Sequence, residues 1–202
     1  MPREVDARIV ELLAARLCHD LIGPVSAVSN GVELLGEDDP DFFKDALALV
    51  GDSARKALRR LQFYRFAYGF RPGGVIAASP HALVEELFED TQIACDYPEP
   101  VRVLPLEWQK LTCNLIAIAA DALPRGGRLG VVPDAGSIAI EASGEGAGPP
   151  AEICDAMTMK TPVDALTPRT VAAYFAGFLS QQLECRLSVT AAAGSFRITA
   201  AP

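Results

Sequence analysis

The sequence has few histidines and tryptophans, and its cysteines are widely scattered. Among 202 residues there are two histidines, one tryptophan and five cysteines, and the cysteines form no C-x-x-C pair. This pattern fits neither a zinc site nor a disulfide framework, so we expect reduced thiols, no metal site and a cytoplasmic protein. No apolar stretch approaches the roughly 18 residues of a membrane span, and the charged start "MPREVDARIVELL" does not resemble a secretory leader. We therefore expect no contact with a membrane.

Runs of basic residues are also missing. The chain carries 18 Lys and Arg against 26 Asp and Glu, which gives a formal net charge of -8. Proteins that hold DNA or RNA place clusters of Lys and Arg against the phosphates, so no nucleic-acid partner is expected. Half of the residues are apolar, which is enough for a folded core in a chain of this length.

The first third of the chain has the periodicity of two long helices. Apolar residues at helical spacing predict helices over 4–35 and 42–68, joined by the turn-like "GEDDPD". The stretch "GFRPGG" then breaks this pattern. We therefore expect a helical hairpin over residues 1–72 and a second domain over 73–202.

The second domain alternates short helical and β-rich segments. Three helices are expected, with starts at Ser79-Pro80 and Thr167-Pro168 typical of capped helix ends. Helices packed on one face of a mostly antiparallel sheet would make an α/β sandwich. The expected helices cover 79–91, 106–121 and 167–184, a short strand covers 101–105, and two hairpins cover 128–143 and 185–201.

One histidine, His19, lies inside the first predicted helix, in "LCHDLIGPVSAVSNG". At about 100° per residue, the large apolar residues of this helix fall on the opposite side, so His19 should point away from the core. A proline inside a helix costs on the order of 3 kcal/mol, so Pro24 predicts a bend just beyond the histidine. The residues expected on the same side as His19 are Leu12, Ala15, Arg16, Ile22, Gly23 and Ser26.

His19 and the adjacent acid suggest nucleophilic chemistry. Imidazole has an unperturbed pKa of about 6.5, and its neutral form is a nucleophile that can attack phosphorus. Asp20 lies about 100° round the helix and could hold one ring nitrogen so that the other is presented. From periodicity alone, a solvated histidine without a role is the competing interpretation.

The stretch "HDLIGP" resembles the H-box of sensor histidine kinases, commonly His-Glu/Asp-Leu-Arg-Thr/Asn-Pro. The matching positions are His19, Asp20, Leu21 and Pro24. Ile22 replaces the arginine, and Gly23 replaces the Thr or Asn that supports dephosphorylation in the family. The resemblance implies a two-helix hairpin that forms a four-helix bundle when two chains pair as a homodimer.

A second resemblance covers the predicted sandwich, which is similar to the ATP-binding domain of these kinases. "NLIAIAADALPRGG" follows the N-box, but Ile118 replaces the asparagine that holds magnesium. "ASGEGAG" keeps two glycines of the adenine box, but Ala142 replaces its aspartate. Isoleucine cannot bind a cation, and alanine cannot accept a hydrogen bond from adenine. The sequence thus implies a degenerate histidine-kinase-ATPase-like sandwich that binds no ATP, with its vestigial site at Asn114, Ile118, Ala142, Gly144 and Gly146.

The sequence keeps the histidine of the H-box but lacks the residues that bind ATP. In this combination it resembles the ChpT-like histidine phosphotransferases of alphaproteobacteria. The resemblance implies that His19 accepts a phosphoryl group from the receiver domain of a hybrid histidine kinase and passes it to receiver domains of response regulators. It implies no cofactor, because the receiver would supply the magnesium. Two alternatives stay open: a divergent ATP-dependent histidine kinase, and a non-catalytic dimeric adaptor that binds receivers.

The receiver should dock around His19. Counting back from the turn near residue 38 places His19 level with about residue 57 of the second helix. Cations at this level could offset the phosphoryl charge or meet an acidic receiver rim, and a solvated basic face is the alternative. These cations are Arg55, Lys56 and Arg59, and the expected apolar centre of the patch is Leu12, Ala15 and Ile22.

Overall fold

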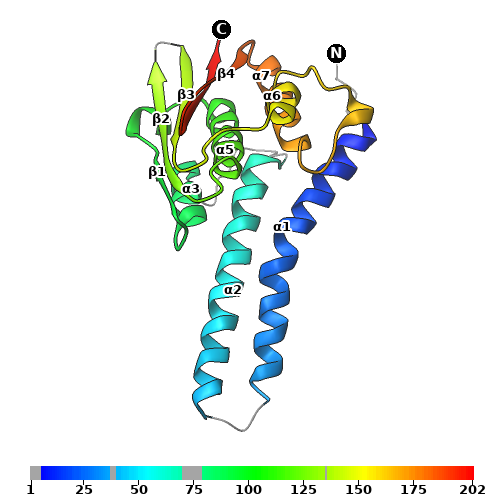
Figure 1. Cartoon of the computed structure of the whole chain (residues 1–202), viewed down its shortest axis with the longest axis vertical. Helices are drawn as coiled ribbons and strands as arrows, with labels where there is room; N and C mark the ends of the chain where they lie inside the picture. Colours follow the sequence, from blue (N-terminus) through cyan, green and yellow to red (C-terminus); the bar gives the residue numbers. More distant parts are fainter. Residues whose placement is uncertain (1–5, 37–39, 70–78, 135) are drawn as a thin grey trace.

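Two long antiparallel helices extend from one end of the molecule. The computed structural model describes residues 6–36, 40–69, 79–134 and 136–202, so the expected domain boundary at 72/73 lies outside the described residues. Helix α1 (Ala7–Leu34) begins at Asp6, whose side chain accepts a hydrogen bond from the Arg8 amide. It runs beside α2 (Pro40–Ala67) as a hairpin (Figure 1). The predicted helical hairpin is confirmed.

The hairpin helices pack closely, and α1 is not straight. A Cβ atom built on Gly31 would lie only 2.6 Å from a methyl group of Val50, so the backbones approach here through a glycine. Helix α1 contains Pro24, and Figure 1 shows that the helix changes direction part-way along its length. Among the described residues, no helix combines the length and hydropathy needed to cross a bilayer.

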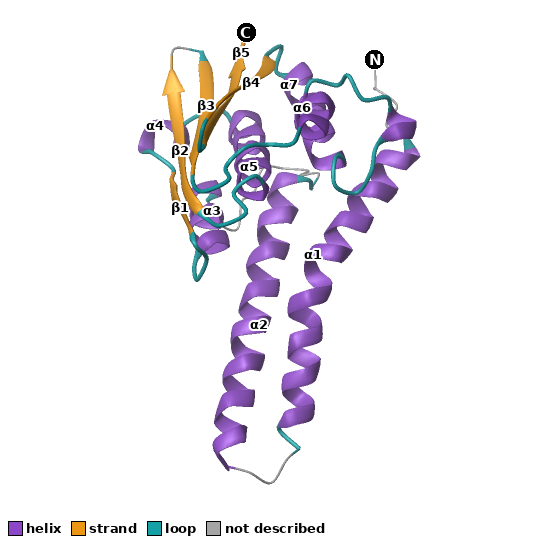
Figure 2. Cartoon of the chain, in the orientation of Figure 1, coloured by secondary structure: helices purple, strands orange, loops and turns teal. Residues whose placement is uncertain are grey.

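The remaining chain forms a five-stranded sheet with helices on one face (Figure 2). The strand order is β1-β2-β3-β5-β4, and β1 pairs with β2 in parallel while the other neighbours are antiparallel. The predicted α/β sandwich is therefore confirmed. The strands are β1 (Ile93–Asp96), β2 (Gly127–Asp134), β3 (Ser137–Ser143), β4 (Arg186–Ala192) and β5 (Ser195–Ala201), and the helices are α3 (Pro80–Phe88), α4 (Glu99–Arg102), α5 (Leu106–Asp121), α6 (Ala151–Met157) and α7 (Val171–Gln182).

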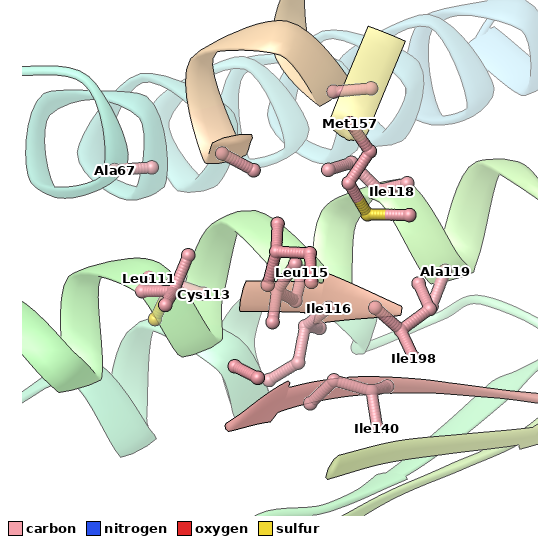
Figure 3. Packing of buried hydrophobic residues seen from close by; sticks show 14 of the residues in the cluster. Ala67, Leu111, Cys113, Leu115, Ile116, Ile118, Ala119, Ile140, Met157 and Ile198 are labelled. Carbon is pink, nitrogen blue, oxygen red and sulfur yellow. The ribbon is translucent and has the colours of Figure 1, made fainter. Parts of the chain in front are cut away.

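Helix α5 is the centre of the core. Leu115 and Ile116 are fully buried and, as Figure 3 shows, they lie near Ile140 of β3 and Ile198 of β5. The same core includes Phe63, from the last turns of α2. The hairpin is thus anchored in the sandwich by apolar burial, which is the main favourable term in folding.

Most predicted elements of the sandwich are present. Helix α5 spans the predicted residues, and α3 starts at Pro80 with the Ser79 hydroxyl accepting from the Ala82 amide at 3.2 Å. Helix α7 starts four residues later than predicted because Thr167 and Thr170 form their own hydrogen-bonded turn.

The predicted strand over 101–105 is wrong. Val101 and Arg102 belong to α4, a single helical turn that starts after Pro98 and contains Pro100, and Val103 follows as its C-cap. Proline fixes φ near its helical value and donates no hydrogen bond to a sheet, so the two prolines favour a turn despite the flanking valines. The strand next to β2 at one edge of the sheet is β1, which the periodicity did not predict. It also did not predict α6 and a 3₁₀ turn (Val163–Ala165).

Candidate functional site

His19 lies on the surface of α1, with one ring nitrogen engaged. Its side chain is 88% exposed, and Nδ1 lies 3.3 Å from Oδ1 of Asp20. The structure therefore places the ring away from the core. Because Nδ1 faces the carboxylate, Nε2 lies on the far side of the ring and is accessible to a reactant.

Asp20 is held from α2. Its Oδ2 accepts a hydrogen bond from the Tyr64 hydroxyl at 2.6 Å, and its main-chain carbonyl accepts from the Arg60 guanidinium. Burial, followed by the hydrogen bond to Asp20, raises the pKa of Tyr64 well above its ordinary value. Tyr64 therefore stays protonated at neutral pH and remains a donor.

Arg60 and Tyr64 are site residues that the sequence reasoning missed. The expected level was about residue 57, whereas the residues that contact Asp20 lie one to two turns further along α2. Side chains on a helix lean toward its N-terminus, so a surface position is covered by residues that follow it in the chain. The sequence does contain a signal for these two residues. Arg60 and Tyr64 are both hydrogen-bond donors, and their four-residue spacing places them on one face of the helix.

Arg16 joins the hairpin to the sandwich beside His19. Its guanidinium pairs with Asp121, the last residue of α5, and donates to the Arg169 carbonyl at 3.4 Å. Arg16 also lies 3.8 Å from Asp20 and is only 15% exposed. One half-buried cation thus fixes α1 against both α5 and the segment before α7.

A cavity of about 720 Å³ opens next to His19. Helix α1 contributes His19, Asp20 and Arg16 to its lining, and the opposite wall comes from α5 and from residues around α6 and α7. Its apolar lining is Ala15, Ile118, Ala122, Pro150, Ile153, Pro168, Ala172 and Ala173. The cavity therefore offers an apolar surface beside a reactive imidazole, with ion-paired groups between them.

The predicted vestigial nucleotide residues have different surroundings. Of the five, the described lining of this cavity includes Ile118 alone. Asn114 is buried, and its amide donates to the carbonyls of Ala67 at 3.0 Å and Lys110 at 2.9 Å. Asn114 thus ties α5 to the end of α2, while Ala142 faces the core, 3% exposed.

The two glycines of the predicted vestigial site, Gly144 and Gly146, pack against the turn after α5. A Cβ on Gly144 would lie 2.5 Å from the Gly126 carbonyl oxygen, and Gly146 has φ +72° and lies against Pro124. Gly126 has φ +74°, and a Cβ there would lie 2.6 Å from the Cβ of Gln92. Close backbone packing is therefore a sufficient reason for these glycines, without a nucleotide.

The expected docking residues around His19 differ in exposure. Ile22 is 62% exposed, and Ala15, Gly23 and Ser26 are exposed as well. Leu12 is half-buried and packs against the core, so it belongs to the joint between hairpin and sandwich. The apolar surface next to His19 is therefore centred on Ile22.

The three predicted cations of α2 have different surroundings. Arg55 is exposed and pairs with Asp52 on its own helix, and Lys56 is exposed. Arg59 is 15% exposed and pairs with Glu89 and Asp90. Arg59 therefore links α2 to the turn after α3, and Arg55 and Lys56 are the better placed to meet a partner.

Comparison with known proteins shows the family. The family model for the histidine phosphotransferase C-terminal domain matches residues 78–195. The protein phosphotransferase ChpT of Brucella abortus (strain 2308) is 30% identical over 189 residues, which cover 90% of each chain. The chain belongs to the ChpT-like histidine phosphotransferases.

The phosphotransferase likeness extends over both parts of the fold. The solved structure of a bacterial phosphotransferase matches with a TM-score of 0.79 and 28% identity, and the match covers 99% of each chain. Hairpin and sandwich therefore belong to one histidine phosphotransferase architecture. The predicted resemblance to the ChpT-like histidine phosphotransferases is confirmed.

Proposed function

We propose that this phosphotransferase carries phosphoryl groups between the aspartates of two receiver domains through a phosphohistidine at His19. One observation supports this most: an 88% exposed imidazole has Nδ1 beside a carboxylate and borders a cavity with a largely apolar lining. The arrangement favours attack by Nε2 on a phosphoryl group that arrives from outside. The N-box resemblance implies that Ile118 replaces the asparagine that would hold magnesium in ATP chemistry.

The transfer requires little acid–base chemistry from the protein. The Nε2 lone pair attacks the phosphorus of an aspartyl phosphate in line; the N–P bond forms as the P–O bond breaks, and the aspartate leaves as a carboxylate. Attack by a second aspartate on the phosphohistidine reverses these steps. Such reactions depend on positioning and charge neutralisation, and we expect the magnesium in the acidic pocket of the receiver to provide the latter.

The receiver should contact the hairpin and the sandwich together. Ile22 offers an exposed apolar contact one turn from His19, and the cavity continues this surface onto α5 and α7. Arg55, Lys56 and Arg169 are exposed cations that complement an acidic receiver rim. In this arrangement the degenerate sandwich serves as a docking surface.

Homodimerisation is part of the proposal. The hairpin exposes apolar side chains that a second hairpin would cover in a four-helix bundle. Apart from Ile22, which we assign to the receiver contact, those at least half exposed are Val10, Val25, Val32, Phe42, Phe43, Leu47, Leu58 and Leu61. Sedimentation should give a dimer, and Leu58→Glu should give monomers. Val103→Glu, at an 81% exposed position outside the hairpin, is the matched control and should stay dimeric.

A labelled-phosphate assay tests the function. A receiver carrying phosphoryl-aspartate should transfer acid-labile label to the wild type but not to His19→Gln, and ATP alone should give no label. Incorporation from ATP would instead indicate a divergent histidine kinase. Receiver binding without any transfer, unchanged in His19→Ala, would indicate a non-catalytic adaptor.

A further inference from the structure

The main-chain carbonyl of Asp20 lacks its ordinary partner within α1. In an α-helix, each carbonyl accepts from the N–H four residues later, and Pro24, at that position, has no N–H. The Arg60 guanidinium of α2 instead donates to this oxygen. A cation on the neighbouring helix thus compensates for the proline that interrupts α1.

The side chain of the same residue is held from the next turn of α2. The Tyr64 hydroxyl donates to Asp20 Oδ2 at 2.6 Å. Tyr64 follows Arg60 by four residues, so the two side chains lie on one face of α2. Two successive turns of α2 therefore bind Asp20 through its main chain and its carboxylate.

The second carboxylate oxygen of Asp20 faces His19. Oδ1 lies 3.3 Å from Nδ1 of the imidazole. A neutral ring that donates from Nδ1 to this oxygen carries its lone pair on Nε2. If the carboxylate rotated, the ring would lose this acceptor and could turn or change tautomer.

We propose that Arg60 and Tyr64 are positioning residues for phosphoryl transfer: they fix Asp20, which in turn fixes the tautomer and orientation of His19. This proposal rests on the proposed function, since it assigns them to transfer at that ring. Neither residue touches the phosphoryl group. As Nε2 bonds to phosphorus and the receiver's carboxylate leaves, positive charge develops on the ring, and the Nδ1 proton is shared with Asp20.

The small number of histidines allows a direct test of the tautomer. With ¹⁵N-labelled histidine, only the rings of His19 and His81 give signals, and His19→Gln assigns them. At pH 8 the wild type should show His19 as the Nδ1–H tautomer. Tyr64→Phe should shift its ring nitrogens toward the average of both tautomers.

The matched control removes a hydroxyl elsewhere. The Tyr97 hydroxyl is buried and has no hydrogen-bond partner within the described part of the chain. Tyr97→Phe should therefore leave the His19 signals and the transfer rate unchanged. Urea unfolding of each variant checks that the fold is retained.

Single-turnover transfer from a phosphorylated receiver provides the second readout. Tyr64→Phe should lower the maximal rate roughly tenfold, the loss typical of a hydrogen bond to a charged group. The receiver concentration that gives half-maximal rate should not change. In an Asp20→Ala background, Tyr64→Phe should cause no further loss, because the two residues act through one contact.

The outcomes separate this proposal from the proposed function. Wild-type rate and unchanged His19 signals in Tyr64→Phe would overturn the positioning role. So would a rise in the half-maximal receiver concentration alone, which would make Tyr64 a docking residue. Failure of the wild type to transfer from any phosphorylated receiver would instead refute the proposed function, while the tautomer measurement would still test the contact.

Discussion

Replacing Gly126 should destabilise the sandwich much more than replacing another glycine with the same backbone conformation. Gly126 and Gly136 have φ angles of +74° and +80°, but only the first has close neighbours. An alanine at Gly136 meets nothing within 4 Å, whereas at Gly126 its Cβ would lie 2.6 Å from the Cβ of Gln92 and closer to its carbonyl oxygen. Comparing Gly126→Ala with Gly136→Ala therefore distinguishes the cost of backbone strain from the cost of close packing.

The two costs can be worked out separately. A left-handed conformation costs an alanine roughly 1–2 kcal/mol, and the lower entropy of the unfolded chain returns about 0.4–1 kcal/mol. Gly136→Ala should therefore lower the free energy of unfolding by about 1 kcal/mol. Overpacking adds typically 1–3 kcal/mol, so Gly126→Ala should lower it by about 2–4 kcal/mol.

Urea unfolding followed by the fluorescence of Trp108, the single tryptophan, measures both variants. Trp108 lies in α5, so its signal reports on the sandwich. The slope of the free energy against urea should stay the same while the midpoint shifts. Equal losses in the two variants would contradict close backbone packing as the reason for a glycine at position 126.

Three further predictions follow from caps and buried groups. Ser79→Ala removes the cap of α3 and should cost about 1 kcal/mol of unfolding free energy; an unchanged urea midpoint would contradict this. Burial raises the pKa of Tyr68 from 10.0 to about 12. Its contribution to stability is complete below pH 10 and is lost as the pH rises toward 12, so urea midpoints should fall over that range more in the wild type than in Tyr68→Phe. Burial also raises the pKa of the Cys113 thiol, so a thiol reagent at pH 8 should label exposed Cys18 first and Cys113 only after unfolding.

The sequence predicted those elements whose local signals agree with the final packing. Helix α5 has apolar periodicity between Pro105 and the "LPRGG" turn, so its predicted and observed bounds coincide. The stretch after Pro98 has the valines of a strand, but two prolines and the burial of Val101 produce a helical turn instead. In this stretch, backbone constraints and tertiary packing outweigh the local β-propensity.

The candidate site was only partly predictable, for a different reason. His19 and Asp20 could be identified because the H-box is contiguous in sequence. The partner of Arg16 is Asp121, 105 residues away, and no local pattern encodes such a contact. Arg60 and Tyr64 depend on the direction in which side chains lean from α2, which residue counting along the hairpin did not include.

The position of the phosphoryl group on the protein decides whether His19 is the residue that carries it. The protein is incubated with a phosphorylated receiver and separated from it, and the phosphorylated residue is identified by mass spectrometry and by phosphorus NMR at alkaline pH. We expect phosphohistidine at His19, bonded through Nε2, and loss of the signal when an unphosphorylated second receiver is added. Phosphate on another residue, or none on the wild type after incubation with receivers that bind it, would show that His19 does not carry phosphoryl groups between receivers.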